Sequence, residues 1–402
     1  MSQLNDASPQ PMIEVQNSSD DSNGPLTATI SYARVEAFKG LFHGGIVLPD
    51  DSLISRFRHL RGSRPVDDFS SDAEFDSFVE GEFNYIGPVY YHFGHFMSEM
   101  VHRIVPTKKL FSCDRWLMVG CSVEKHLNST EKFPEFLVQI FDYLNIKMSD
   151  ITIVSQNSIV RKINISEPGA VPGLEPNRSY LDLVGAFSQN RLDEIYKNSD
   201  SPNKVYVTRS GLAGAGAFLG EKYLESLLEK HGFTIFFPEL HEISKQMDVY
   251  RRADILIFSE GSACHGVELL GGDMLNRCYL LARRDSHADA FSKVLKSRSK
   301  EFNCLKAPQL LGVLAVNPNT KIPYENLAVS VFDVDALVEF FRENQICDLE
   351  HFSATKYFEM AEIDLYNYYD FYQKSGVKFV DWWNVGDLKL NFLRKKQESM
   401  RA

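Results

Sequence analysis

Residues 204–266 decide the fold, and they read KVYVTRSGLAGAGAFLGEKYLESLLEKHGFTIFFPELHEISKQMDVYRRADILIFSEGSACHG. Short apolar runs alternate in this stretch with longer amphipathic ones, and the alternation continues to residue 281. Apolar strands separated by helices are typical of a parallel sheet that is covered by helices on both faces. The pattern predicts a Rossmann-like domain with strands at 205–207, 233–237, 255–258 and 279–281, and with helices at 221–230, 243–252 and from residue 262.

A similar alternation occupies residues 30–160 and predicts a second α/β domain, with strands at 85–87, 116–119 and 151–154 and helices at 90–110 and 135–144. The polar run at 198–203 marks a boundary near residue 200. The first 28 residues are rich in Ser, Asp, Asn, Gln and Pro, which indicates disorder. We therefore expect a disordered tail at 1–28, an N-terminal α/β domain at 29–200, a C-terminal Rossmann-like domain at 201–330, and C-terminal helices at 331–402.

The composition excludes several classes of protein. The chain has 43 Lys+Arg against 54 Asp+Glu, a net charge of −11, which argues against a nucleic-acid partner held by phosphate contacts. No stretch approaches the ~20 apolar residues of a membrane-spanning helix, and the first residues do not resemble a signal peptide. The six cysteines include no Cys-x-x-Cys pair, so neither a disulfide framework nor a zinc knuckle is expected. We expect a cytoplasmic protein with reduced thiols.

The expected helix at 90–110 carries a polar stripe that could do chemistry. At 100° per residue, its histidines and charged residues share one face, opposite an apolar one; they are His92, His95, Glu99, His102 and Arg103. Such a stripe is typical of a helix that lines a cleft, and equally of a solvated helix face. Histidine and glutamate are also metal ligands, but no second cluster supplies a closing ligand, so no metal site is expected.

A second candidate site follows the strand at 205–207, where Arg209 and Ser210 begin a glycine-rich loop. The loop at the carboxyl end of a parallel strand opens onto the ligand crevice, and a planar guanidinium suits phosphate. Three glycines and an acidic residue of this region also resemble, weakly, a dinucleotide-binding fingerprint; they are Gly214, Gly216, Gly220 and Glu239. A flexible surface loop explains the glycines equally well.

A third candidate site is the turn after the strand at 255–258. Small residues here let a ligand approach the backbone, and the N–H groups that begin the next helix attract a diphosphate. These residues are Gly261, Ser262 and Ala263, bracketed by Glu260 and His265. The alternative is a tight turn in which Ser262 caps the helix.

Taken in order, these stretches resemble the family-61 glycosyltransferases, whose bacterial branch includes capsular polysaccharide biosynthesis proteins. The similarity covers about residues 80–285. It consists of an aromatic-Gly-His-aromatic-x-x-Glu helix at 93–99 followed by Arg103, an Arg-Ser pair at 209–210, Glu221 and Leu224 at the start of the next helix, and a Gly-Ser-Ala turn at 261–263.

The resemblance implies a GT-B architecture, in which two Rossmann-like domains face each other across a cleft. It implies an inverting transfer from a nucleoside diphosphate sugar to a hydroxyl of a glycan acceptor, in the synthesis of capsule or another cell-surface polysaccharide. The acceptor would bind the N-terminal domain, and the C-terminal helices would pack back on that domain. The donor would bind the C-terminal domain through Arg209, Ser210, Glu221, Gly261, Ser262, Ala263 and His265.

Inversion requires a base that deprotonates the acceptor hydroxyl. The chemically able candidates are His95, Glu99, His92 and Glu260, and we favour His95. An arginine and a helix dipole can meet the charge of the leaving group, so neither a divalent metal nor another cofactor is expected. The basic residues 394–396 could contact an anionic membrane surface.

Two other functions stay open at this point. The first is a nicotinamide-dependent oxidoreductase that uses the glycine-rich loop at 211–220 together with Glu239. The second is a nucleotide-binding scaffold without catalytic activity. Binding of UDP, GDP or CMP, as opposed to NAD(P), distinguishes the transferase from the oxidoreductase.

Overall fold

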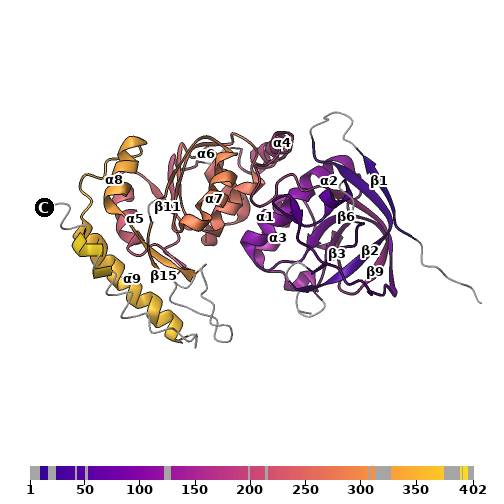
Figure 1. The fold of residues 1–402 in the computed structure, drawn as a ribbon. Coiled ribbons are helices and arrows are strands. Elements are labelled where there is room, and N and C mark those ends of the chain that lie inside the picture. The colour runs from indigo at the N-terminus through magenta and orange to yellow at the C-terminus, as the bar shows by residue number, and fades with distance from the viewer. Residues whose placement is uncertain are drawn as a thin grey trace, which may run out of the picture. The chain divides into compact units, whose positions relative to one another are not determined.

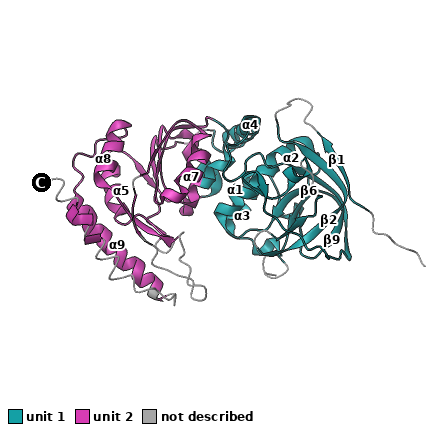
Figure 2. Cartoon of the chain, viewed as in Figure 1, with its two compact units in different colours: residues 1–197, 242–247, 265–272 teal, residues 198–241, 248–264, 273–402 magenta. Residues whose placement is uncertain are grey.

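The chain folds into two compact units, which Figure 2 shows in different colours. The computed structural model describes residues 10–16, 24–40, 43–49, 53–121, 128–197, 200–212, 216–306, 308–312, 327–374, 390–391 and 393–396. Unit 1 comprises residues 1–197, 242–247 and 265–272, and unit 2 comprises residues 198–241, 248–264 and 273–402. The chain therefore passes from one unit to the other several times.

Unit 1 is built on a mixed sheet, in which the described strands have the order β1-β2-β9-β6-β7-β8, with β3 paired to β2 (Figure 1). The strands are β1 (Met12–Gln16), β2 (Thr27–Gly40), β3 (His43–Ile46), β6 (Ser77–Pro88), β7 (Trp116–Val119), β8 (Ile151–Val154) and β9 (Ser158–Ser166). From β9 through β6 and β7 to β8 the pairing is parallel, while β2 pairs antiparallel with β1, β3 and β9. The N-terminal domain is thus α/β as expected, but its antiparallel half is not Rossmann-like, which corrects that part of the prediction.

Strand β1 lies inside the segment that the composition predicts to be disordered. It pairs antiparallel with β2, from Met12 opposite Ser31 to Gln16 opposite Thr27. Along β1, half-buried Ile13 and Val15 alternate with exposed residues, which is the period of a strand with one covered face. Backbone pairing and these two side chains order the strand, so the expectation of disorder is wrong for residues 12–16.

The helices predicted at 90–110 and 135–144 are present in unit 1, the first with a break, and the unit also contains α4, which was not predicted. They are α1 (Phe93–Glu99), η2 (Val101–Arg103), α2 (Ile104–Leu110), α3 (Glu135–Tyr143) and α4 (Arg178–Ile195), with short turns at η1 (Ile54–Phe57), η4 (Thr130–Lys132) and η5 (Met148–Asp150). The 3-10 turn η2 interrupts the helix expected at 90–110. Because of this interruption, His102 and Arg103 are buried among other partners and do not extend the polar face of His95 and Glu99.

Unit 2 contains the predicted parallel sheet, in which the described strands have the order β11-β10-β12-β13-β14. They are β10 (Lys204–Val207), β11 (Thr234–Phe236), β12 (Ile255–Ser259), β13 (Leu275–Leu281) and β14 (Ser299–Leu305). The chain adds β11 on one side of β10 and then β12 on the other side, so the strand order reverses between β10 and β12. Sheets of this kind bind ligands beyond the carboxyl ends of the strands, at the reversal.

Helices cover both faces of this parallel sheet, as its apolar strands predict. Tyr206 and Ile257 share one buried cluster with Leu224 of α5, while Tyr250 of α6 packs on Phe258, with ring centroids 5.2 Å apart. The segments that follow the strands are α5 (Glu221–Lys230), η6 (Pro238–Leu240), α6 (Ile243–Arg252), η7 (Ser262–Leu269) and α7 (Asp285–Lys296). The helix expected from residue 262 is thus the 3-10 helix η7.

The C-terminal segments that the structure describes belong to unit 2, whereas the sequence led us to expect them on the N-terminal domain. They comprise the hairpin β15 (Pro308–Gly312) and β16 (Val329–Phe332), and the helices α8 (Val334–Glu343) and α9 (Ala354–Lys374). Aromatic residues of α9 complete the core of unit 2, which also contains Tyr206 and Leu224. The Tyr357 hydroxyl accepts a hydrogen bond from the backbone N–H of Phe332 at 2.7 Å, and Asp364 accepts one from that of Gly220 at 2.8 Å.

The basic run at 394–396, expected to contact a membrane surface, is partly engaged within the protein. Arg394 pairs with Glu362 at 2.5 Å. In the part of the chain that the structure describes, no helix has both the length and the hydropathy to cross a bilayer.

Candidate active site

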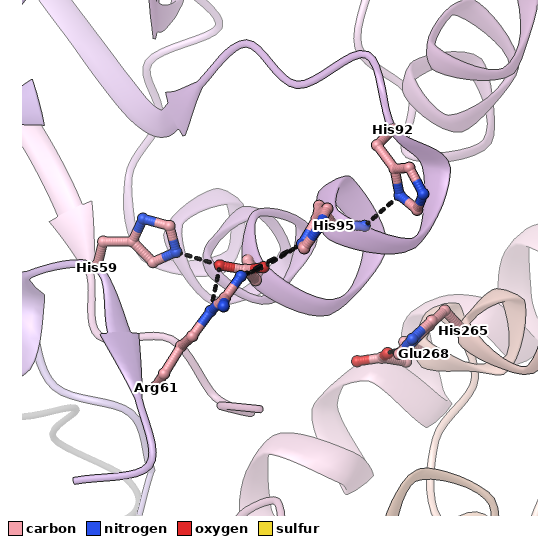
Figure 3. Close-up of polar contacts among 7 residues, drawn as sticks. His59, Arg61, His92, His95, His265 and Glu268 are labelled. Atoms are coloured by element: carbon pink, nitrogen blue, oxygen red, sulfur yellow. Dashed lines mark hydrogen bonds and ion pairs between the residues drawn. The ribbon is translucent and has the colours of Figure 1, made fainter. Parts of the chain in front are cut away.

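A histidine–carboxylate centre forms where α1 meets a segment that precedes it by about 40 residues. The hairpin of β4 (Leu60–Arg61) and β5 (Arg64–Pro65) brings His59 and Arg61 to Glu99. Figure 3 shows the side chains of His59 and Arg61 pointing to the same place as that of His95. Nδ1 of His95 lies 2.7 Å from Oε1 of Glu99, and Nη2 of Arg61 lies 2.8 Å from the same oxygen. Nε2 of His59 contacts the other oxygen, Oε2. Glu99 is thus the common partner of two histidines and one arginine.

The ionised state of Glu99 fixes the tautomer of His95. Burial alone would raise the pKa of Glu99, but hydrogen bonds from His59, His95 and Arg61 outweigh burial and hold this pKa well below its usual range. An ionised carboxylate only accepts hydrogen bonds, so the His95 ring carries a hydrogen on Nδ1. In the neutral ring Nε2 then holds the lone pair, and no described residue bonds it. The side chain is 38% exposed, so a substrate hydroxyl can reach a base of this kind.

His92 begins helix α1. Its Nδ1 accepts a hydrogen bond from the backbone N–H of His95 at 3.4 Å, and the two rings lie 4.9 Å apart. Burial lowers the pKa of His92. A neutral ring that caps a helix through Nδ1 is a structural element, which favours His95 over His92 as the base.

A second histidine–carboxylate centre lies in unit 1, on the part of η7 that belongs to this unit (Figure 3). Nδ1 of His265 is 2.5 Å from Oε1 of Glu268, and Nε2 of His102 is 2.6 Å from Oε2. The other ring nitrogen of His102 is 2.7 Å from the Tyr180 hydroxyl of α4. A Cβ atom on Gly94 would meet the His92 ring at 3.3 Å and the His265 ring at 3.4 Å. His265, expected among the donor-binding residues of the C-terminal domain, therefore lies beside the start of α1.

In unit 2, the two loops predicted to bind the donor meet at the strand reversal. Arg209 follows β10 and Gly261 follows β12, and a Cβ atom at position 261 would lie 2.0 Å from Nη1 of Arg209. Only glycine therefore leaves room for this guanidinium, whose Nη2 donates to the carbonyl of Gly216 at 3.3 Å. Half-buried Ser262 and Ala263 follow at the start of η7. The structure brings these predicted residues together.

Both carboxylate oxygens of Glu260 accept hydrogen bonds from two arginines that follow β13. Its Oε2 accepts from the backbone N–H groups of Arg283 at 2.7 Å and Arg284 at 2.8 Å, and its Oε1 accepts from Nε of Arg284 at 2.9 Å. Burial, then repulsion by Arg284 and Arg209, lowers the pKa of Arg283 to about 9. Glu260 is fully buried with both oxygens occupied, which argues against the expectation that it can act as the base.

The side chain of Glu221 also points into the protein interior. It is 1% exposed, and its Oε1 accepts from the Tyr206 hydroxyl at 2.8 Å and from the backbone N–H of Arg209 at 3.4 Å. Burial raises the pKa of the Glu221 carboxyl to about 7. The Ser210 N–H donates to Thr208 Oγ1 at 3.0 Å, within the same loop. Glu221 therefore supports the Arg209 loop from inside and does not offer its carboxylate to a ligand.

Comparison with protein families identifies the segment that carries these centres. Residues 93–269 match the family model Glycosyltransferase 61. The chain contains a glycosyltransferase 61 domain. This domain begins at the first residue of α1 and ends at the last residue of η7. It includes His95, Arg209 and Glu268, whereas His59 and Arg61 precede it. A search of curated proteins found no match to the chain.

Several functional candidates of the glycosyltransferase 61 domain and its surroundings were not predicted from the sequence. Arg61 belongs to the two-residue strand β4 and His59 precedes it, and so short a strand has no recognisable apolar pattern. Two features of the sequence could nevertheless have pointed to other residues of the candidate site. The i,i+3 spacing of His265 and Glu268 resembles that of a helical pair, and two consecutive arginines follow the predicted strand at 279–281.

The glycine-rich loop of the domain serves packing where the structure describes it. Gly220 has φ 75°, and a Cβ atom there would meet the Tyr357 ring at 2.7 Å. Close approach to α9 therefore accounts for this glycine. A Cβ atom on Gly211 would meet Oε1 of Glu239 at 2.5 Å, and Gly214 lies outside the described residues. Across the described ranges, no three His, Cys, Asp or Glu side chains are grouped to hold a metal ion.

Proposed function

We propose that the chain is an inverting glycosyltransferase that moves a sugar from a nucleoside diphosphate sugar to a hydroxyl of a glycan acceptor. The observation that carries the proposal is the 2.7 Å pairing of His95 with Glu99 inside a glycosyltransferase 61 domain. This pairing leaves Nε2 of His95 as a base on a partly exposed ring. Inversion in one step requires such a base.

In the proposed reaction, the acceptor oxygen attacks the anomeric carbon while its proton moves to Nε2 of His95. The bond from that carbon to the diphosphate oxygen breaks, and its electron pair leaves with the nucleoside diphosphate. The new bond forms on the opposite side of the carbon, so the configuration inverts. Glu99 orients the ring and stabilises the imidazolium that forms. Arg61 and His59 keep Glu99 ionised, so the proton stays on His95.

The proposed donor site is the strand reversal of unit 2. Arg209, Arg283 and Arg284 place positive charge at the carboxyl ends of β10 and β13, and an arginine fork matches two phosphate oxygens. Gly261 lets the phosphates approach the backbone. These fixed positive charges stabilise the negative charge that develops on the leaving diphosphate. The proposal therefore includes no divalent cation. A GT-B arrangement of the two units is part of the proposal.

The acceptor and the location of the reaction rest on the resemblance to capsule biosynthesis proteins. We place the reaction in cell-surface polysaccharide synthesis, in the cytoplasm. A contact with an anionic membrane surface would use the exposed Lys395 and Lys396, since Arg394 is engaged with Glu362. An oxidoreductase is less well supported, because Gly220 packs on Tyr357, where a fingerprint glycine would face a pyrophosphate.

The test is a ligand panel followed by turnover. UDP, GDP, CMP and NAD(P) are screened by thermal shift, and the sugars of each stabilising nucleotide are then assayed for nucleotide release with glycan acceptors. We expect one nucleoside diphosphate to raise the melting temperature and NMR of the product to show an inverted anomeric configuration. Stabilisation by NAD(P) alone would support the oxidoreductase, and nucleotide binding without turnover of any donor would support the scaffold.

A further inference from the structure

The hairpin that carries His59 and Arg61 is too short to hold its own position. Strands β4 and β5 pair over two residues each, and a two-stranded hairpin is at best marginally stable by itself. Its two side chains nevertheless reach Glu99, where Nη2 of Arg61 lies 2.8 Å from Oε1. The position of the hairpin therefore depends on its contacts with the rest of unit 1.

Two charged side chains hold the peptide group that joins Arg58 to His59. Nη2 of Arg103 donates to the carbonyl of Arg58 at 2.7 Å, and Oδ2 of Asp67 accepts from the N–H of His59 at 3.2 Å. This carbonyl and this N–H are the two polar ends of one planar peptide group. A peptide group that is bonded at both ends cannot rotate, so the backbone that leads into His59 has a fixed direction. We call Arg103 and Asp67 the peptide clamp.

Both members of the peptide clamp are buried and tied to other parts of unit 1. Nη1 of Arg103 donates to the carbonyl of Ser166, the last residue of β9, at 2.6 Å. Oδ1 of Asp67 accepts from Nε of Arg58 at 2.8 Å. Arg103 is 4% exposed, and the side chain of Asp67 is 7% exposed. The clamp thus connects the hairpin to the central sheet of the unit.

The chemistry of Arg103 favours a role in geometry over a role in stability. Burial lowers the pKa of Arg103 to about 10, so the guanidinium keeps its charge at pH 7. The desolvation of a buried charge offsets much of the energy of its hydrogen bonds. The planar guanidinium instead adds direction, because it reaches two carbonyls at fixed angles.

The position of the hairpin decides how the charge of Glu99 is balanced. Glu99 is 5% exposed, and Arg61 supplies a fixed positive charge beside it. If the hairpin moved away, Glu99 and His95 would together take up one proton, because a buried anion without a compensating charge is too costly. Either group can hold this proton along the hydrogen bond between Glu99 and Nδ1 of His95. In both forms Nε2 of the ring carries a hydrogen and is no longer a base.

We propose that Arg103 and Asp67 are positioning residues, which act through the peptide group between Arg58 and His59 to keep Nε2 of His95 unprotonated. The proposal rests on the proposed function for the role of His95 and deepens it, because it adds the residues that prepare the base. All of these residues belong to unit 1. Neither member of the clamp contacts the substrate in this proposal.

The protonation of His95 is tested by NMR on the full chain labelled with ¹⁵N-histidine, at pH 7. The ¹⁵N shift distinguishes a ring nitrogen that carries a hydrogen from one that does not, and His95→Asn identifies the signals. In the wild type we expect a hydrogen on Nδ1 and none on Nε2. In Arg103→Met we expect a hydrogen on Nε2 in a large part of the molecules.

Arg191→Met is the matched control, because Arg191 also donates to two backbone carbonyls of unit 1. They are those of Tyr143 and Asp142, at 3.3 and 3.1 Å. This variant should leave the His95 signals unchanged. An unprotonated Nε2 in folded Arg103→Met, or the same change in Arg191→Met, would overturn the proposal and leave the proposed function standing. A hydrogen on Nε2 in the wild type would overturn both.

Asp67→Asn tests the other side of the clamp and carries the test if Arg103→Met does not fold. The amide keeps one acceptor oxygen, so it can replace one of the two hydrogen bonds that the carboxylate accepts. We expect a smaller gain of hydrogen at Nε2 of His95 than in Arg103→Met. Unchanged His95 signals in folded Asp67→Asn would remove Asp67 from the clamp.

Turnover separates positioning from stability. A histidine base in the wrong tautomer loses up to ~10⁴-fold in rate, and the hairpin keeps the hydrogen bond from the Gly62 N–H to the Pro172 carbonyl. We therefore expect kcat in Arg103→Met to fall about 10²-fold, with donor affinity unchanged. Arg103→Lys should restore part of the loss, since an ammonium can still donate to the carbonyl of Arg58, and Arg191→Met should keep the wild-type kcat. A lower melting temperature with wild-type kcat in Arg103→Met would reduce Arg103 to a structural role.

Discussion

In unit 1 the buried carboxylates Glu99 and Glu268 each pair with histidines, and Glu99 also with Arg61, whereas in unit 2 the buried carboxylate of Glu260 pairs with Arg284. Glu99 and Glu268 accept hydrogen bonds from histidine rings, while Glu260 holds Arg284 and the backbone after β13. Histidine changes its charge within the range of pH at which proteins work, and arginine does not. The difference teaches that both histidine–carboxylate pairs lie in unit 1, whereas the buried carboxylate beside the proposed donor site in unit 2 holds an arginine, whose charge does not change. The following predictions test this division, from the largest expected effect to the smallest.

His95→Ala should produce the largest loss, and only in turnover. General-base catalysis contributes ~10² to 10⁴-fold in rate, so kcat should fall by that factor. Binding of the nucleotide, measured by calorimetry, should not change, because the proposed donor site lies in unit 2.

Glu99→Gln is the companion variant for this measurement. The amide keeps the shape of the carboxylate but loses the charge that stabilises the imidazolium, so we expect a smaller fall in kcat of the same kind. If His95→Ala lowers only the melting temperature, and the folded enzyme keeps its turnover number, the pair merely braces α1.

Glu221→Gln should change how stability depends on pH. Because the pKa of Glu221 is about 7 in the folded chain and about 4.5 in the unfolded chain, the folded state binds the proton more tightly between these values. Stability is therefore highest below pH 4.5 and falls as the pH rises to about 7, by about 3 kcal/mol for this group. Urea unfolding at a series of pH values should show this fall in the wild type and not in the variant.

Glu229→Gln is the matched control, since Glu229 is exposed on the same helix, α5. Its pH dependence should equal that of the wild type. The opposite sign for Glu221, with stability gained as the pH rises, would mean that the carboxylate is stabilised as an ion by Arg209.

Arg209→Ala should weaken nucleotide binding without slowing the chemistry of bound donor. A charge-assisted hydrogen bond contributes ~1.5 to 3 kcal/mol, so we expect affinity to fall ~10- to 100-fold by calorimetry. Arg277→Ala removes a partly exposed arginine of β13 that pairs with Asp254, and should leave affinity unchanged. Equal binding by folded Arg209→Ala would remove this residue from the donor site.

Tyr357→Phe should have the smallest effect, confined to unit 2. It removes the acceptor of the Phe332 N–H, a buried hydrogen bond with a net value of about 1 kcal/mol. Hydrogen exchange should become faster in β16 and α9 and stay constant in β6 of unit 1. Faster exchange across β6 as well would show that the two units unfold as one.

The sheet of unit 2 was predictable because its strands are continuous apolar runs between helices. The longest strand of unit 1 was not, since β2 reads TATISYARVEAFKG and mixes small, polar and apolar residues. Its register depends on partners far along the chain, such as Ser166 opposite Thr27. A pattern of neighbours in sequence carries no information on such pairing.

The candidate site was predictable where chemistry follows directly from a strand or helix. His95, Arg209 and Gly261 fall in this class. The sequence shows a carboxylate after β12 but not that backbone N–H groups after β13 occupy Glu260, and it shows Glu221 at a helix start but not that the side chain turns inward. The orientation of such a side chain depends on the hydrogen-bond partners that segments far away in the sequence provide.

Because the chain passes between the two units several times, a single cut in the sequence does not separate them. Residues 265–272, far downstream of the boundary near residue 200, complete unit 1: Glu268 pairs with His102, and the Leu269 carbonyl accepts from Ser188. A fragment that stops at residue 200 would leave His102 buried without its carboxylate, so neither half is expected to be recoverable as an independent folded piece. Recombination that swaps donor specificity between relatives would therefore need to exchange unit 2 while residues 265–272 stay with unit 1.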